Sequence, residues 1–273
     1  MRRYLEVDVF ASGPLTGNPL AVVVDAAGLD TAAMQAFARW TNLSETTFLL
    51  PPTDPLADYR VRIFTPFEEY PFAGHPTLGS ARAWLATGGV PATAGRVVQE
   101  CGAGLVPVRL DGATLAFAAP PRTRTGPVDT ATLDRLLPAL GIGPADVVAH
   151  EWGVNGPAWP MLQLGSLTTL RAISPEAGVR AGLVGLCALA DEGPHAYEVR
   201  GLFEGGEDPV TGSLNAALAQ WLRMRGLVPA RYTVSQGRAI GRNGIVTVDD
   251  DGTDVWIGGE ASVVVSGTVA LES

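Results

Sequence analysis

The 273-residue sequence contains no lysine, because all 19 of its basic residues are arginine. A chain without lysine cannot form an internal Schiff base with pyridoxal phosphate or with a carbonyl substrate. It also lacks the lysine with which a P-loop binds a nucleotide phosphate. The sequence therefore excludes several classes of enzyme before any motif is considered.

Cysteine and long apolar runs are scarce as well. Cys101 and Cys187 are the only cysteines, and they lie too far apart for a zinc-binding spacing or a disulfide framework. No apolar run approaches the roughly 18 residues of a membrane span, and the first residues alternate like a strand rather than a leader. We expect a cytoplasmic protein that binds neither a metal nor a membrane.

The composition is that of a compact, turn-rich globule, with 47% apolar residues, 17% charged residues, 33 glycines and 21 prolines. Its formal net charge is −9. A negative chain has no nonspecific electrostatic attraction for nucleic acid or for anionic lipid. Small molecules are the expected partners.

Two six-residue segments resemble each other at a distance of about half the chain. His75-Pro76-Thr77-Leu78-Gly79-Ser80 has an echo in Asp208-Pro209-Val210-Thr211-Gly212-Ser213, at an offset of 133 residues (208 − 75), and an apolar, helix-like stretch follows each. The echo predicts two related halves, 1–118 and 119–273, each with a helix N-terminus. The last strand, at about 260–273, is free to return to the first half. The first position of the echo differs, His75 against Asp208, and we expect this difference to supply the chemistry.

Helical and strand-like periods alternate along both halves, which predicts a mixed α/β fold. One predicted helix begins at Asp30 or Thr31 and ends near Trp40, and another covers 211–225. The apolar faces of these two helices are predicted to comprise Met34, Phe37, Ala38 and Trp40 in the first, and Leu214, Leu218, Trp221 and Leu222 in the second.

Four short segments hold the candidate chemistry. They are Gly17-Asn18-Pro19, Asn42-Leu43-Ser44-Glu45-Thr46, Pro71-Phe72-Ala73-Gly74-His75-Pro76 and Glu207-Asp208-Pro209-Val210-Thr211-Gly212-Ser213. In this order they resemble the phenazine-biosynthesis isomerase-like, or PhzF-like, family, which shares a fold with diaminopimelate epimerase. The resemblance covers essentially the whole chain. It implies an α+β fold of two pseudo-symmetric domains, each a curved mixed sheet wrapped around a central helix, with the active site in the cleft between them.

The resemblance also implies the catalytic residues. Glu45 matches a carboxylate that moves a proton between carbons of an unsaturated substrate, first as a base and then as an acid. His75 and Asp208 would orient the amino or hydroxyl groups of the substrate and assist the proton transfer. No cofactor is implied.

Substrate binding is expected at the two helix N-termini, where free N–H groups and the helix dipole favour a carboxylate. The binding residues implied are Asn18, Gly74, Gly212 and Ser213. Each candidate also has an ordinary structural interpretation. Asp208 before Pro209 has the pattern of an N-cap, and His75 and Asn18 could simply occupy turns.

Two departures from the family pattern leave the substrate open. The segment 199–206 is shorter than usual and carries Glu204, whose charge would disfavour a second substrate carboxylate. Tyr70 stands where an aliphatic residue is more common. The exact substrate, its pathway and the stereochemical course are not determined by the sequence.

The leading interpretation is a cofactor-independent isomerase that shifts a double bond in a small unsaturated or cyclic amino or hydroxy carboxylate, within secondary-metabolite biosynthesis. A dihydro-hydroxyanthranilate is the prototype substrate, and a homodimer is expected. An amino-acid epimerase or racemase is one alternative, but two-thiol epimerisation requires cysteines at the helix starts. A noncatalytic small-ligand binding protein with the same cleft is the other.

Overall fold

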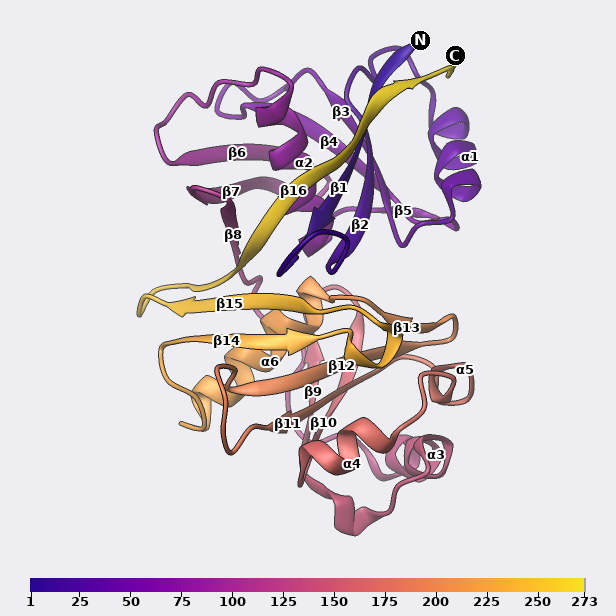
Figure 1. Ribbon diagram of the computed structural model, residues 1–273, viewed down its shortest axis with the longest axis vertical. Helices are drawn as coiled ribbons and strands as arrows, with labels where there is room; N and C mark the ends of the chain where they lie inside the picture. The colour runs from indigo at the N-terminus through magenta and orange to yellow at the C-terminus, as the bar shows by residue number, and fades with distance from the viewer. Residues whose placement is uncertain (273) are drawn as a thin grey trace. The chain divides into compact units, whose positions relative to one another are not determined.

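The computed structural model describes residues 1–272 and divides into two compact units (Figure 1). The first unit contains Met1–Ala118 and the segment from Gly258 onward. The second contains Ala119–Ile257. The last strand therefore begins in the second unit and ends in the first.

The first unit consists of a mixed sheet and two helices. Its elements are β1 (Arg2–Val9), β2 (Asn18–Val23), α1 (Thr31–Thr41), β3 (Thr46–Leu50), β4 (Tyr59–Phe64), β5 (Glu69–Tyr70), α2 (Gly74–Ala86), β6 (Arg96–Cys101), β7 (Gly104–Asp111), β8 (Thr114–Ala118) and the greater part of β16 (Val255–Val269).

The second unit has a similar composition, with additional short helices. Its elements are α3 (Thr130–Leu140), a 3₁₀ turn (Pro144–Asp146), β9 (Val147–Val154), β10 (Ala158–Leu164), α4 (Leu167–Ala172), α5 (Ala177–Ala181), β11 (Val184–Leu189), β12 (Tyr197–Phe203), β13 (Gly206–Asp208), α6 (Gly212–Met224), β14 (Arg231–Gln236), a second 3₁₀ turn (Arg238–Ile240) and β15 (Gly244–Asp250).

The two sheets repeat one topology. In the first unit β1–β2 is antiparallel, β2–β3 parallel, β3–β4 antiparallel, β4–β6 parallel and β6–β7 antiparallel. In the second unit β9–β10, β10–β11, β11–β12, β12–β14 and β14–β15 follow the same alternation. In the first unit β16 pairs with β1 and also neighbours β8, so that this sheet closes into a barrel.

The register of the repeat is the same at several points. Thr46 pairs with Phe64 and Val184 pairs with Leu202, so both partners are shifted by 138 residues (184 − 46 and 202 − 64). The central helices obey the same offset, since α2 begins at Gly74 and α6 at Gly212 (212 − 74 = 138).

This register corrects the echo of 133 residues. The segment that starts at His75 lies inside α2, whereas the segment that starts at Asp208 begins four residues before α6 and only its last two residues lie in that helix. The structural counterpart of His75 is therefore Ser213, and that of Asp208 is Tyr70. The two units are related, but the two similar six-residue segments do not occupy equivalent positions in them.

The central helices are buried on nearly all sides, as expected for a helix enclosed by a curved sheet. Most residues of α2 and α6 are inaccessible to solvent. Small residues permit this close approach, because a Cβ atom at Gly79 would lie 2.5 Å from Leu20 Cδ2 of β2. The predicted fold class, two halves that each have a curved mixed sheet around a central helix, is confirmed.

Helix α1 packs on the outer face of the first sheet. Asp30 caps it by accepting a hydrogen bond from Ala33 N, and Met34 and Phe37 bury their side chains against Phe48. Trp40 was predicted on this buried face but is 79% exposed, stacked on Phe37. In the second unit α3, α4 and α5 share one core with β10, β11 and β12.

Candidate active site

Glu45, His75 and Asn18 lie together in the first unit. Glu45 directly precedes β3, His75 is the second residue of α2, and Asn18 opens β2. His75 Nε2 is 3.5 Å from Glu45 Oε2, and His75 Nδ1 is 3.4 Å from Asn18 Nδ2. The side chain of His75 is 5% exposed and that of Glu45 is 14% exposed. Glu45 is thus the more exposed member of a largely buried pair of polar side chains.

The protonation state of His75 follows from its surroundings. Burial lowers its pKa to about 3, so the ring is neutral at physiological pH. The Asn18 amide nitrogen can only donate, and Nδ1 must therefore accept. The remaining proton is on Nε2, the nitrogen that faces Glu45. The ring of His75 therefore carries no charge beside Glu45 at physiological pH.

Gly74 begins α2 at the same place. The preceding residue, Ala73, provides no side-chain cap, so no side chain occupies the first-turn N–H groups from that position. Gln99 donates to Thr77 Oγ1 at 3.0 Å, and Thr77 Oγ1 donates to Ala73 O at 2.9 Å. The sheet therefore fixes the first turn from one side and leaves a positive helix end beside His75.

In the second unit Asp208 is the last residue of β13 and belongs to a buried hydrogen-bond network. The Thr211 hydroxyl donates to Asp208 Oδ2 at 2.6 Å and accepts from Gln236 Nε2 at 2.9 Å. Gln236 Oε1 accepts from Thr211 N at 3.0 Å and from Asn215 Nδ2 at 2.8 Å. Because Gln236 uses both ends of its amide, it fixes which way the Thr211 hydroxyl points.

The N-cap interpretation of Asp208 is wrong. The residue before α6 is Thr211, which has the extended backbone of a cap, and Asp208 lies four residues before Gly212. Its neighbour Glu207 is fully buried and paired with Arg200, which also donates to Leu170 O at 3.0 Å. Asp208 is thus held between a buried ion pair and the Thr211 hydroxyl.

Gly212 and Ser213 open α6, as Gly74 and His75 open α2. The hydroxyl of Ser213 accepts a hydrogen bond from Trp159 Nε1 at 3.1 Å, and its carbonyl accepts from Asn155 Nδ2 at 2.9 Å. The hydroxyl proton of Ser213 remains available to a ligand, because the indole nitrogen is only a donor.

Each unit therefore groups part of the predicted set: Asn18, Glu45, Gly74 and His75 in the first, and Asp208, Gly212 and Ser213 in the second. The structure adds Thr211, Gln236 and Trp159, which sequence reasoning did not assign to the site. Thr211 belongs to one of the four segments that carry the family resemblance, and this was the signal that could have found it.

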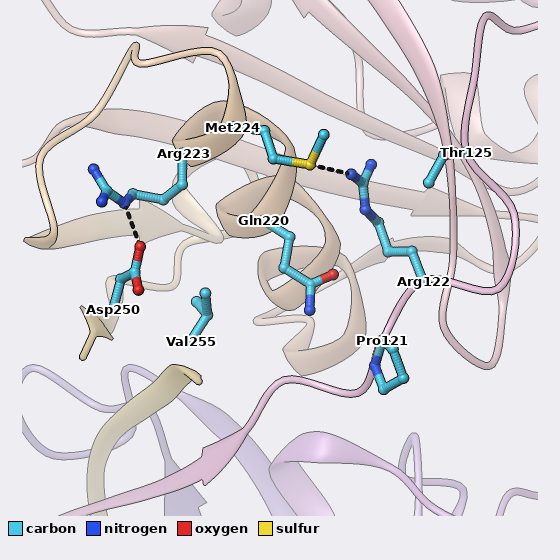
Figure 2. A pocket seen from close by; sticks show the side chains of 8 residues that line it. All are labelled: Pro121, Arg122, Thr125, Gln220, Arg223, Met224, Asp250 and Val255. Atoms are coloured by element: carbon cyan, nitrogen blue, oxygen red, sulfur yellow. Dashed lines mark hydrogen bonds and ion pairs between the residues drawn. The ribbon is translucent and has the colours of Figure 1, made fainter. Parts of the chain in front are cut away.

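A pocket of about 530 Å³ lies elsewhere in the second unit, at the C-terminal end of α6 (Figure 2). Arg223 reaches Asp250 at 2.8 Å on one side, and Arg122 lies 3.3 Å from the Met224 sulfur on the other. None of the predicted site residues lines this pocket.

The cysteines are not arranged for two-thiol chemistry. Burial raises the pKa of the Cys187 thiol to about 12, and Cys101 ends β6 with a raised pKa that burial also causes. The central helices begin instead with Gly74-His75 and Gly212-Ser213. Among residues 1–272 no cluster of three or more His, Cys, Asp or Glu side chains is arranged to hold a metal ion.

No helix in the described part of the chain is long and apolar enough to cross a membrane.

Comparison with known proteins agrees with this architecture. The chain is 33% identical to trans-2,3-dihydro-3-hydroxyanthranilate isomerase of Pseudomonas chlororaphis, covering 99% of this chain and 100% of that protein. It is 33% identical to antisense-enhancing sequence 1 of Schizosaccharomyces pombe, over 97% of each chain. The solved structure of a predicted epimerase from Pseudomonas aeruginosa matches all of both chains with a TM-score of 0.81 and 30% identity. The model of the phenazine biosynthesis-like (PhzC-PhzF) family matches residues 7–267, and the chain belongs to this family.

Proposed function

We propose that this protein is a cofactor-independent isomerase that moves a proton and a double bond in a small unsaturated amino or hydroxy carboxylate. The observation that carries the proposal is the position of Glu45, a slightly exposed carboxylate 3.5 Å from a buried, neutral histidine. A relative of nearly equal length bears the name of an isomerase of this type. Secondary-metabolite biosynthesis is the proposed setting.

Glu45 is the proton carrier in this mechanism. The carboxylate removes a proton from a carbon next to the unsaturated system, the double bond moves, and the protonated Glu45 returns the proton to another carbon. His75 does not compete for the proton, because burial keeps it neutral and Nε2 already carries hydrogen. Its Nε2, 3.5 Å from Glu45 Oε2, is placed to donate to the carboxylate when the substrate complex draws the two groups together.

The substrate carboxylate is proposed to bind at the α2 N-terminus, where the cap residue Ala73 offers no side chain to the first-turn N–H groups. Asp208 keeps the role that the resemblance implies, binding an amino or hydroxyl group of the substrate. This role is supported by the Thr211 hydroxyl, which donates a hydrogen bond to Asp208 Oδ2 and so orients the carboxylate. Gly212 and Ser213 offer further donors.

The experiment follows trans-2,3-dihydro-3-hydroxyanthranilate by proton NMR in deuterated water. We expect the wild type to isomerise it with incorporation of deuterium at carbon, and Glu45→Gln to lose at least about a thousandfold in rate, as expected when a general base is removed. Glu68→Gln is the matched control, because it removes the same charge from an exposed position in the same unit.

Loss of activity in the control as well would contradict a special role for Glu45. If the wild type leaves the compound unchanged, this substrate is wrong. If a panel of related unsaturated amino acids also shows neither double-bond movement nor exchange, the isomerase proposal itself fails and ligand binding without catalysis becomes the better account.

The epimerase alternative is less well supported. Racemisation by two thiols needs a thiolate on each side of the carbon, and neither Cys101 nor Cys187 opens a central helix. Exchange of the α-proton of an amino acid without movement of a double bond, in the same NMR experiment, would favour epimerisation by other groups.

A further inference from the structure

Tyr70 occupies in the first unit the position that Asp208 occupies in the second. Tyr70 pairs with Ile63 and Asp208 pairs with Gly201, so both members of the pair are shifted by 138 residues (208 − 70 and 201 − 63). Each residue ends a short strand, four residues before the glycine that opens the central helix. The duplicated architecture thus presents a phenol in one unit where it presents a carboxylate in the other.

The strand register shows which way Tyr70 points. Thr47, Ile63 and Tyr70 form one row across β3, β4 and β5. Thr47 Oγ1 accepts a hydrogen bond from Ser80 of α2 at 2.9 Å, so this row lies on the face that carries the central helix. Opposed residues in a row share one face of a sheet, and Tyr70 is therefore directed to the side of α2.

The neighbouring row points the other way and acts as an internal check. Glu69 pairs with Arg62 at 2.6 Å, and Arg62 also donates to Thr31 of the outer helix α1 at 2.9 Å. Because successive residues alternate between faces, Glu69 outside places Tyr70 inside. Glu45 lies on the inside as well, since it faces His75 of α2.

The electrostatics of the phenol agree with this placement. Burial raises the pKa of Tyr70, and the charges of Glu68 and Glu45 raise it further. The side chain is half-buried, and its hydroxyl makes no hydrogen bond to any residue between 1 and 272. The phenol thus remains protonated near Glu45 with its hydrogen available.

We propose that Tyr70 is a further substrate-contacting residue, whose hydroxyl donates a hydrogen bond to an oxygen substituent of the substrate held at Glu45 and His75. The inference rests on the proposed function and deepens it by naming a specificity determinant. A site built to hydrogen-bond a hydroxyl group selects against an analogue that lacks it. Tyr70 therefore favours a hydroxylated carboxylate over its deoxygenated counterpart.

The first test needs no substrate. The ultraviolet absorbance of phenolate is titrated in wild type and Tyr70→Phe, and their difference isolates Tyr70. The same pair is then measured in the Glu45→Gln background. We expect the Tyr70 titration to move to lower pH when the Glu45 charge is absent, since Glu68 is unchanged throughout. An unchanged titration would overturn the proposal, whatever the substrate is.

The second test measures selectivity with two stable probes, 3-hydroxyanthranilate and anthranilate, by calorimetric titration of binding. We expect the wild type to prefer the hydroxylated probe and Tyr70→Phe to lose about tenfold of that preference, the equivalent of one net hydrogen bond. Tyr4→Phe is the control, because the Tyr4 hydroxyl bonds Glu6 and its ring packs on α1. It should keep the preference.

The outcomes separate the two proposals. If the wild type binds both probes and Tyr70→Phe keeps the preference, the role of Tyr70 is overturned and the proposed function stands. If the wild type binds neither probe, the hydroxybenzoate-like substrate class and the hydroxyl contact both fail. The phenolate titration still decides whether Tyr70 faces Glu45.

Discussion

At the scale of the residue, the proposed chemistry of the first unit depends on a histidine that stays neutral. His75 sits in the first turn of a buried helix, where its ring is shielded from water on one side and held by Asn18 on the other. His75 lies 3.5 Å from Glu45, but its lowered pKa makes it a poor base, so it does not compete with Glu45 for a proton. Neutrality of the histidine is thus part of the proposed mechanism, and stability measurements can detect it.

We expect the stability of the wild type to fall as the pH falls from about 6.5 to about 3, partly because of His75. Its folded pKa of about 3 lies below the unfolded value of 6.5, so the unfolded state binds the proton first in that window. Each pKa unit corresponds to about 1.4 kcal/mol, so this contribution amounts to a few kcal/mol.

The measurement is the free energy of unfolding in urea at several pH values, for wild type, His75→Asn and His195→Asn. The slope of stability against pH should be smaller in His75→Asn and unchanged in His195→Asn, whose histidine lies in a loop near Thr233. Equal slopes in all three proteins would contradict a depressed pKa for His75.

Thr211 is the second residue that a single substitution can test. Thr211→Val removes the hydroxyl that links Gln236 to Asp208, so we expect a loss of about 1–3 kcal/mol in unfolding free energy and about tenfold in kcat/KM. Thr211→Ser retains the hydroxyl and should recover most of both. If the serine variant behaves like the valine variant, the hydroxyl is not what positions Asp208.

At the scale of the element, both central helices are attached to their sheets by a buried glutamine. Gln99 of β6 bonds Thr77 in the first turn of α2, and Gln236 of β14 bonds Thr211 and Asn215 at the start of α6. Thr77 and Asn215 occupy equivalent positions, 138 residues apart (215 − 77). The repeated device fixes the helix N-termini that carry the proposed site.

A second repeated feature offers a matched pair of mutations. Arg62–Glu69 and Arg200–Glu207 are equivalent ion pairs, at 2.6 Å each, but the first is partly exposed and the second is almost fully buried. We expect Arg200→Met to cost about 3–5 kcal/mol, because it leaves Glu207 as a buried, unpaired charge. Arg62→Met should cost about 0–1 kcal/mol.

The comparison uses urea unfolding of the two variants under identical conditions. Similar losses in both would show that burial does not distinguish the two pairs. Because Arg200 also donates to carbonyl groups of the α4–α5 segment, a further expected result is faster hydrogen exchange in that segment for Arg200→Met alone.

At the scale of the whole molecule, the first unit is completed by the end of the chain. β16 pairs with β1 from Arg2↔Val269 to Val9↔Ala261, so residues from the two extremes of the sequence form one ladder. The barrel of the first unit therefore cannot close until residues 261–269 pair with β1, a long-range contact of the kind that slows folding.

Removal of residues 258–273 should accordingly damage the first unit more than the second. We expect the amides of β1 and β2 to lose protection from hydrogen exchange, while α6 remains protected within its own sheet. Uniform protection across β1 in the truncated protein would show that the ladder with β16 contributes little.

The sequence by itself predicted that the chain is duplicated, and it located the helices near 31–40 and 211–225. These features are encoded locally, in apolar spacing and in turn residues, and the family resemblance supplied Glu45 and His75 as catalytic residues and Asn18 as a binding residue. The structure places those three side chains together. The chemical roles of Glu45, His75 and Asp208 remain predictions for the experiments above.

Only the tertiary structure decided the register of the duplication. The echo of letters suggested 133 residues, whereas strand pairing sets 138, because hydrogen-bonded ladders fix the relation between distant strands and six similar letters do not. The same reason explains why Trp40 is exposed, why Thr211 rather than Asp208 precedes α6, and why the sequence did not show that Tyr70 is the counterpart of Asp208. Which side chain is buried, and which one faces Glu45, depends on partners that are far away in the sequence.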